Sequence, residues 1–349
     1  MKKILVVDDS PNVVQFLCKS LEGMGYAVNF VVNPLLLFPL LKKEKYDLLL
    51  LDFLMPEMNG LEVIKKLKEA QHSIPPVIMI TGNRDDNLFE QAFSAGVIDY
   101  IIKPFHEIEM RVRIHAALQL QHEKQRYIEL VDNIFPPAVA QELLKTGRYE
   151  SRSFPSATIA FSDFCNFTQT TESWPSKVLV ERLEYYFNAF DFIMTRNELE
   201  RIKTLGDGYM FGSGLSKEDP EHAVKCIRGA LEMLDFVQEC KKKHQKGELK
   251  FSFSARIGVN SGPITAGVLG RNRLAYDIWG DTVNTAHRIE SHGMENNVTI
   301  SKETYKLVSS QFSCKKLGEV EVKSKGKIPI YIVEGGIVDG KRDLGYCSE

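Results

Sequence analysis

The sequence lacks a strong net charge of either sign. Its 44 Lys and Arg residues nearly balance its 46 Asp and Glu residues, which leaves a formal net charge of -2. A partner such as nucleic acid or an anionic membrane surface is usually signalled by a large basic excess, so we expect neither here. Any substrate must therefore be inferred from local groups of residues.

The sequence also lacks paired cysteines and long apolar runs. Its six cysteines include no CxxC pair, which argues against a zinc site or a disulfide framework and favours reduced thiols. No apolar run approaches the roughly 20 residues that are needed to span a bilayer. We therefore expect a cytoplasmic protein that does not bind a membrane.

The chain is long enough for two domains, because it has 349 residues and a hydrophobic fraction of 44%. Over residues 1–120, amphipathic segments separate the short apolar runs KILVV, YDLLLLD, PVIMITG and DYIIKPF. Near-continuous apolar runs are typical of strands that are buried on both faces of a parallel sheet. This pattern predicts a doubly wound α/β domain with a parallel sheet.

A helical linker is predicted for residues 111–150. Its apolar stripe is interrupted by polar residues and consists of Ile114, Ala117, Gln121, Lys124, Ile128, Val131 and Phe135. Such a stripe predicts a weak coiled coil that joins two copies of the chain, although a single surface helix between two domains would give a similar pattern. A shorter helix should begin at Pro136-Pro137 and end at Gly147.

Residues 151–335 show a different order of elements, and residues 336–349 form a tail. Strand patterns such as ATIAFSDF and FSARIGVNSG alternate with long helical patterns, and a hairpin is expected in IKTLGDGYMFG. This order predicts a second domain of the α+β class.

Polar residues follow several of the apolar runs in the first domain. Asp8 and Asp9 follow the first run, Asp52 the second, Thr81 the third and Lys103 the fourth. The carboxyl ends of parallel strands meet at one edge of a sheet, where clustered carboxylates would require a hard cation such as Mg²⁺. Asp52 could then attack a phosphoryl group, with Lys103 and Thr81 holding its oxygens. The simpler alternative is that this Asp-Asp pair only precedes a helix that starts at Ser10 and Pro11.

The segments VVDDS, LDFLMPEMNG, ITG and DYIIKPF together resemble the response-regulator receiver family. The resemblance implies that Asp52 is the phospho-acceptor and that an upstream histidine kinase supplies the phosphoryl group. It also implies that Asp8, Asp9 and the carbonyl of Leu54 bind Mg²⁺. The residues implied in switching and in phosphoryl binding are Thr81, Tyr100 and Lys103. The alternative is a dimerisation scaffold that is never phosphorylated.

Two carboxylates stand out in the second domain. Asp163 ends a strand pattern, and Asp207 lies in a Gly-Asp-Gly hairpin tip. If their strands are neighbours, this pair could hold two divalent ions that clamp a nucleoside triphosphate. Gly-Asp-Gly alone is more often a simple turn.

Further polar groups follow along the chain. Asn284 and Arg288 share one helix face, with Asp281 as the expected N-cap. Lys323 and Lys325 lie in a strand-to-turn segment. Taken singly, these residues fit a solvated helix face and an edge strand.

The segments FSDFCNFT, IKTLGDGYMFGSG, VNSGPITAGVLG, YDIWGDTVNTAHRIES and VKSKGK together resemble the class III adenylyl and guanylyl cyclases. The resemblance implies a ferredoxin-like α+β fold and a homodimer whose two sites lie between the chains. It implies that Asp163, Asp207 and the Phe164 carbonyl hold two Mg²⁺ or Mn²⁺ ions in each site. Asn284 would orient the ribose, and Arg288 would stabilise the transition state.

The same resemblance assigns the phosphate contacts. Lys325, or in its place Lys323, would bind the terminal phosphates, and Arg273 is a further candidate. The substrate would be ATP and the products cyclic AMP and pyrophosphate.

Lys203 and Asp277 are the residues expected to recognise the base. A Lys donor and an Asp acceptor fit the N1 and amino group of adenine, whereas guanine reverses both groups. The alternatives are a guanylyl cyclase, a salt bridge between the two residues without a ligand, and a degenerate module that only binds nucleotide. The family commonly has other residues at Phe164, Asn166 and His287, but none of these changes removes a metal ligand.

Overall fold

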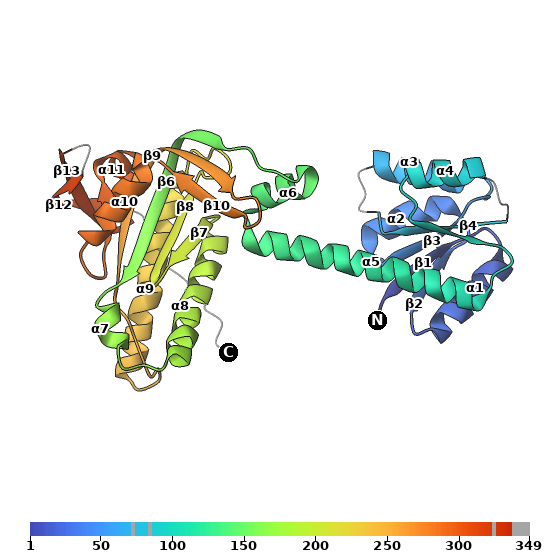
Figure 1. Ribbon diagram of the computed structural model, residues 1–349, viewed down its shortest axis with the longest axis horizontal. Coiled ribbons are helices and arrows are strands. Elements are labelled where there is room, and N and C mark those ends of the chain that lie inside the picture. The colour runs from blue at the N-terminus through green and yellow to red at the C-terminus, as the bar shows by residue number, and fades with distance from the viewer. Residues whose placement is uncertain (71–73, 83–85, 323–325, 337–349) are drawn as a thin grey trace. The chain divides into compact units, whose positions relative to one another are not determined.

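The computed structural model describes residues 1–349 except 71–73, 83–85, 323–325 and 337–349 (Figure 1). The chain forms two compact units, Met1–Leu130 and Val131–Glu349. Within the described part, no helix is both long and apolar enough to cross a membrane.

The first unit is the predicted doubly wound α/β domain. Its five parallel strands are ordered β2-β1-β3-β4-β5. The strands are β1 (Lys3–Val7), β2 (Ala27–Val31), β3 (Leu48–Asp52), β4 (Val77–Thr81) and β5 (Asp99–Ile102). The helical segments are α1 (Pro11–Gly23), η1 (Pro34–Leu36), α2 (Leu37–Lys43), α3 (Gly60–Glu69), α4 (Asp86–Ser94) and α5 (Glu107–Ile134).

Both faces of this sheet are covered, because alternate residues of a strand point to opposite faces. Leu49 and Leu51 of β3 pack in one core with residues of α2, α3 and α4. Leu48 and Leu50 of the same strand pack in the other core with residues of α1 and α5. Burial on two faces explains why the strands are almost entirely apolar in sequence.

Helix α5 confirms the helical linker but changes its predicted seam. Ile114 and Ala117 are buried in the core of the first unit, and Phe135 is buried in a core of the second unit. Ile114, Ala117 and Phe135 are therefore wrong as seam residues, because each is buried in a core of its own unit.

Helix α6 (Pro137–Thr146) follows α5 after a break at Phe135 and Pro136. As expected, Pro137 starts the helix, and Gly147 ends it in the left-handed conformation with φ 74°. Val139 and Ala140 of α6 are buried in the same core as Phe135. The short helix is thus anchored on the second unit.

The second unit has an eight-stranded sheet in the order β12-β13-β11-β9-β6-β8-β7, with β10 paired to β9. Its strands are β6 (Arg152–Phe164), β7 (Glu200–Leu205), β8 (Gly208–Ser213), β9 (Ala255–Leu269), β10 (Ala275–Trp279), β11 (Val298–Ser301), β12 (Phe312–Val322) and β13 (Gly326–Gly336). Its remaining helices are α7 (Phe167–Thr171), α8 (Ser176–Arg196), α9 (His222–Gln245), α10 (Asp281–Ser291) and α11 (Lys302–Val308). Residues of α8 and α9 form one large core with the sheet, and α6 and α10 contribute to another. The predicted α+β class is confirmed.

Candidate active site and phospho-acceptor site

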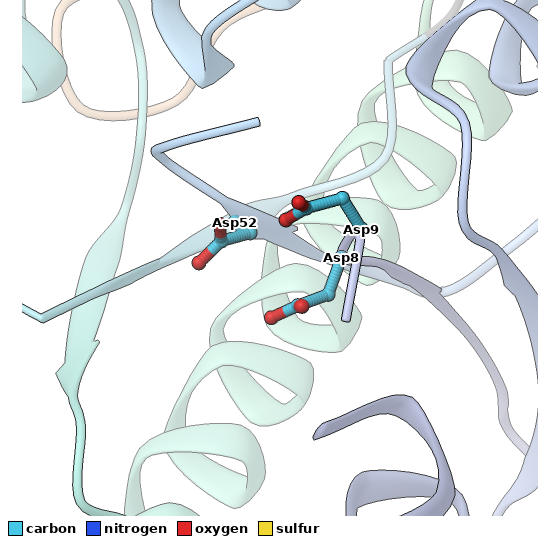
Figure 2. A group of neighbouring side chains, drawn as sticks. All are labelled: Asp8, Asp9 and Asp52. Carbon is cyan, nitrogen blue, oxygen red and sulfur yellow. The ribbon is translucent and has the colours of Figure 1, made fainter. Parts of the chain in front are cut away.

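Three carboxylates meet at the carboxyl end of the parallel sheet in the first unit. Asp8, Asp9 and Asp52 each offer an oxygen atom, and these oxygens all lie within 4.8 Å of one another. Figure 2 shows the three side chains grouped around one point. Asp8 is fully buried and Asp52 is 4% exposed, so their charges cannot be dispersed into water. Oxygen ligands at this spacing fit a hard divalent cation such as Mg²⁺.

Lys103 links two of these carboxylates. Its Nζ lies 2.8 Å from Asp8 Oδ2 and 2.8 Å from Asp52 Oδ1. Burial raises the pKa of Asp52, and the hydrogen bond from Lys103 offsets only part of that rise. Burial acts to lower the pKa of Lys103, but its hydrogen bonds to Asp52 and Asp8 outweigh this and raise it. Lys103 therefore remains charged and can hold a phosphoryl oxygen on Asp52.

The other predicted residues of this unit lie at neighbouring strand ends. Thr81 ends β4 and is buried, and Leu54 follows β3 with an exposed side chain. The ring of Tyr100 on β5 stacks on Phe89, with ring centroids 3.9 Å apart, and the guanidinium of Arg113 lies 5.4 Å from its centroid. Sequence reasoning missed Phe89 and Arg113, because neither belongs to a recognisable motif.

The simpler explanation of the Asp-Asp pair is only partly supported. Ser10 is the N-cap residue of α1 and Pro11 its first residue, but the Ser10 side chain makes no cap hydrogen bond. Instead, the Ser10 backbone N–H donates to Asp8 Oδ1 at 2.9 Å. The start of the helix thus helps to orient one of the clustered carboxylates.

A second carboxylate pair lies in the other unit. Asp163 is near the end of β6, and Asp207 lies between β7 and β8; Ser162 and Tyr209 are paired across β6 and β8. Burial, and then the charge of Asp163, raises the pKa of Asp207 to about 6. Two partly buried carboxylates that repel one another fit a site for divalent cations, because a cation would remove the repulsion.

The side chain of Phe164 packs in an aromatic core and so fixes its backbone beside this carboxylate pair. Its ring is buried, with centroids 4.7 Å from that of Phe253 and 5.1 Å from that of Tyr186. The unusual Phe therefore has a packing role. The Phe164 backbone N–H donates a hydrogen bond to the Asp207 carboxylate, which acts to lower the pKa of that carboxyl.

Arg256 is a site residue that sequence reasoning missed. It lies opposite Asp163 in the β6–β9 register, and its Nη2 is 3.0 Å from Asp163 Oδ2. Its Nε is 2.6 Å from Oε1 of Glu290, which is a buried residue of α10. A guanidinium beside the carboxylate pair is a candidate phosphate ligand. The available signal was a charged residue between the buried residues Ala255 and Ile257 of a strand.

Helix α10 carries the other predicted catalytic groups. Asn284 and Arg288 line a cavity of about 490 Å³, together with Asp281, His287, Ser291, His292 and Val322. Asp281 is the first residue of the helix and not its N-cap, because Gly280 with φ 143° occupies that position. The ring of His287 lies 5.2 Å from that of Phe161 on β6.

The base-recognition residues come together from two strands. Lys203 of β7 donates from Nζ to Asp277 Oδ2 of β10 at 2.6 Å. The other carboxylate oxygen, Oδ1, accepts from the backbone N–H of Ile278 at 2.9 Å. Of the phosphate candidates, Arg273 is exposed between β9 and β10, while Lys323 and Lys325 lie outside the described residues.

Comparisons with known proteins match each of the two units to a known domain family. The model of the adenylate and guanylate cyclase catalytic domain matches residues 149–335, and that of the response regulator receiver domain matches residues 4–115. The receptor-type guanylate cyclase gcy-28 of Caenorhabditis elegans is 33% identical over 264 residues, which are 72% of this chain and 20% of that protein. An adenylate cyclase of Mycobacterium tuberculosis is 30% identical over 224 residues, or 64% of this chain and 49% of that protein.

Among solved structures, the adenylyl cyclase CyaB from P. aeruginosa is similar, with a TM-score of 0.50 and 29% identity. The match covers 56% of this chain and all of that one. The chain spans a fifth to a half of the length of the curated relatives given above.

The fold and the two carboxylate clusters define a receiver domain joined to a class III nucleotide cyclase domain. The chain belongs to the adenylate and guanylate cyclase catalytic domain family, and its N-terminal unit is a response regulator receiver domain.

Proposed function

We propose that this protein is a phosphorylation-regulated adenylyl cyclase that converts ATP to 3′,5′-cyclic AMP and pyrophosphate as a homodimer. The observation that carries the choice of ATP is the contact of 2.6 Å between Lys203 and Asp277. It places an ammonium donor and a carboxylate acceptor side by side, as the edge of adenine requires. Guanine would set its O6 against the carboxylate and its N1 hydrogen against the ammonium.

The residues of the second unit have separate roles in the proposed reaction. Asp163, Asp207 and the Phe164 carbonyl would hold two divalent ions, Mg²⁺ or Mn²⁺. When bound, such ions make the 3′ hydroxyl more acidic and neutralise charge on the leaving pyrophosphate. Asn284 would orient the ribose, and Arg288 would stabilise charge on the α-phosphate in the transition state.

The bonds in this step balance without a covalent enzyme intermediate. The ribose 3′ oxygen bonds to the α-phosphorus as the bond from that phosphorus to pyrophosphate breaks, and the hydroxyl proton leaves to solvent. Lys325 or Lys323, with Arg273 as a further candidate, would hold the terminal phosphates. Arg256 is close enough to Asp163 to contribute as well.

Two chains are needed in this proposal. Class III cyclase domains place metal ligands on one wall of a pocket and the ribose and transition-state residues on the other, each wall from a different domain. This chain has one cyclase domain with both sets of residues, so a two-fold dimer would form two equivalent sites.

The receiver unit would control this dimer. A histidine kinase would phosphorylate Asp52, with Mg²⁺ held by Asp8, Asp9 and the Leu54 carbonyl. Asp52→Asn should abolish labelling by acetyl phosphate, because an amide is not a nucleophile and carries no charge for the metal. Stable labelling of the purified variant would contradict this assignment.

A guanylyl cyclase is the second candidate, because relatives such as gcy-28 are named as guanylate cyclases. The deciding experiment is to incubate the purified full chain with ATP or GTP and with Mg²⁺ or Mn²⁺, and to identify the products by mass spectrometry. We expect cyclic AMP to be the main product. Cyclic GMP as the only cyclic product would favour the second candidate. The absence of any cyclic nucleotide under all four conditions would reject cyclase activity.

A further inference from the structure

His287 is an exposed histidine of α10 that lies beside two of the proposed substrate contacts. It follows Asn284 by three residues and directly precedes Arg288, and residues three or four apart lie on the same side of a helix. All three side chains are exposed and line the same cavity of about 490 Å³. The imidazole therefore borders the same space as the two proposed contacts.

The sheet-facing side of α10 is held by polar contacts, whereas its cavity side is not. Glu290 on the buried side forms an ion pair with a residue of β9. By contrast, the side chains of Asn284, His287 and Arg288 make no hydrogen bond or ion pair within the part of the chain that the structure describes. These three polar side chains are therefore available to a ligand.

The ring of His287 is positioned by Phe161 of β6. The two ring centroids are 5.2 Å apart, and the ring planes are inclined by 59°. Phe161 is 7% exposed and belongs to a core of the second unit. Because a side chain that is already positioned loses less freedom on binding, this contact favours a ligand-binding role. Ring contact requires neither imidazole nitrogen as a hydrogen-bonding group.

A metal site is another chemistry that two histidines on one helix suggest. His292 also lines the cavity, but it lies five residues after His287, which is about 140° around the helix. Two histidines of one helix that share a metal ion are commonly four residues apart. Among the described residues, neither histidine belongs to a group of three possible metal ligands. The pair therefore does not fit a metal site.

The charges of the cavity indicate where an anion would bind. Asp281 and Arg288 both line it, but they are seven residues apart, which is about 10 Å along the helix. His287 lies at the end with the positive charge. Phosphate groups would therefore be attracted to the end of the cavity that contains Arg288 and His287.

We propose that His287 is a third substrate contact of α10 and that its imidazole donates a hydrogen bond to a phosphate oxygen of the nucleotide. This inference rests on the proposed function, which places the ribose at Asn284 and the α-phosphate at Arg288. Neutral imidazole has one N–H donor and imidazolium has two, so a donor is present in either state. A donor beside Arg288 adds a charge-assisted hydrogen bond to the phosphates.

Two substitutions separate this role from packing alone. His287→Phe keeps a ring against Phe161 but has no donor, whereas His287→Gln keeps an N–H donor but loses the ring. The probe is inorganic pyrophosphate with Mg²⁺, titrated into the full chain by calorimetry. His287→Phe should bind it about tenfold more weakly, since one hydrogen bond to a charged group is lost. His287→Gln should stay within about threefold of the parent.

Adenosine is the matched ligand control because it has no phosphate, and its affinity should change less than about twofold in His287→Phe. His122→Phe, at an exposed histidine of the first unit, is the matched variant and should bind pyrophosphate as the parent does. Circular dichroism checks that each variant is folded.

Three results would overturn the proposal. They are parental pyrophosphate binding by folded His287→Phe, an equal loss in the Phe and Gln variants, and the absence of pyrophosphate binding by the parent. A loss confined to the Gln variant would fall under the first result and would show that the ring serves only to pack on Phe161.

Failure of this contact and failure of the cyclase assignment can be distinguished. Selective loss of pyrophosphate binding in His287→Phe, in a protein that makes no cyclic nucleotide, would support the contact and reject the proposed function. Cyclic AMP formation together with parental pyrophosphate binding by His287→Phe would do the reverse.

Discussion

At the scale of single residues, the fold raises the pKa of the Asp207 carboxyl. Its pKa of about 6, raised by burial and by Asp163, lies above the ordinary value of 3.8. The folded protein therefore binds this proton more tightly than the unfolded chain does. Between these two pH values the unfolded chain has lost its proton while the folded protein still binds it. The free energy of unfolding therefore falls as the pH rises, and this loss is complete once the pH is above about 6.

Asp207→Asn should remove this penalty in metal-free protein. In EDTA at pH 7.5 we expect the variant to melt about 2–4 °C above the parent, and the difference should vanish near pH 4, where the parent carboxyl is protonated. Adding Mg²⁺ should stabilise the parent and not the variant, because the amide is a poor ligand for a hard cation. Thermal melts with and without metal provide the measurement. A variant that melts at or below the parent in EDTA at pH 7.5 would contradict the assigned repulsion.

A second prediction at the residue scale concerns base recognition by Lys203 and Asp277. Lys203→Glu with Asp277→Cys supplies an acceptor for the guanine N1 hydrogen and removes the carboxylate that would repel O6. The ratio of kcat/KM for ATP to that for GTP should fall at least tenfold, since mispaired polar groups in a closed site cost about 1–3 kcal/mol each. The assay measures both cyclic nucleotides, and the two single variants serve as controls. If the folded, active double variant keeps the parental ratio, these residues do not recognise the base.

At the scale of elements, Gly258 of β9 allows α10 to pack closely against that strand. A Cβ added at Gly258 would lie 2.0 Å from the backbone nitrogen of Glu290 and 2.3 Å from its Cα. Backbone atoms cannot rotate away as a flexible side chain can, so the helix would have to move. Asn284 and Arg288 would move with it, as would the Glu290 carboxylate that pairs with Arg256.

Gly258→Ala should therefore lower kcat about 100-fold or more, because a displacement of about 1 Å is enough for such a loss. Overpacking should also cost about 1–3 kcal/mol of unfolding free energy. Gly318→Ala on β12 is the matched control, since no atom lies within 4 Å of the added Cβ, and it should change stability by less than about 0.5 kcal/mol. Urea unfolding and initial rates measure both effects. Normal kcat in Gly258→Ala would show that the position of α10 does not matter for the reaction.

At the scale of the whole molecule, the proposed dimer makes a quantitative prediction. Asp163→Ala removes a metal ligand, and Arg288→Ala removes transition-state stabilisation, so each homodimer should be nearly inactive. In a mixed dimer whose pockets take one wall from each chain, both lesions fall in one pocket and the other is intact. Random pairing makes about half of the dimers mixed, so coexpression should restore about a quarter of parental activity if the pockets act independently.

Pull-down with two different tags establishes that mixed dimers form. If they form and remain as inactive as either parent variant, then Asp163 and Arg288 do not act across the dimer. Strict coupling of the two pockets, or a site within one chain, would then have to replace the proposed arrangement.

The sequence by itself determined the two domain classes and named most of the candidate site residues. Buried strands of a parallel sheet are apolar on both faces, so β1, β3, β4 and β5 were visible as short apolar runs. Polar residues after those runs, such as Asp52, pointed to one edge of the sheet, because strand ends in such a sheet coincide. Motifs around Asp163, Asp207 and Arg288 carried the resemblance to a family, since their spacing is local in the chain.

Only the tertiary structure decided which distant groups meet. The contact of Arg256 with Asp163 depends on the register of β6 and β9, and that of Lys103 with Asp8 depends on the order of strands in the sheet. Which face of α5 is buried was decided in the same way. Ile114 and Ala117, which the sequence suggested for pairing with a second copy, are buried in the receiver core, because burying apolar surface within the chain requires no partner. The buried face therefore depended on packing, which sequence periodicity alone does not specify.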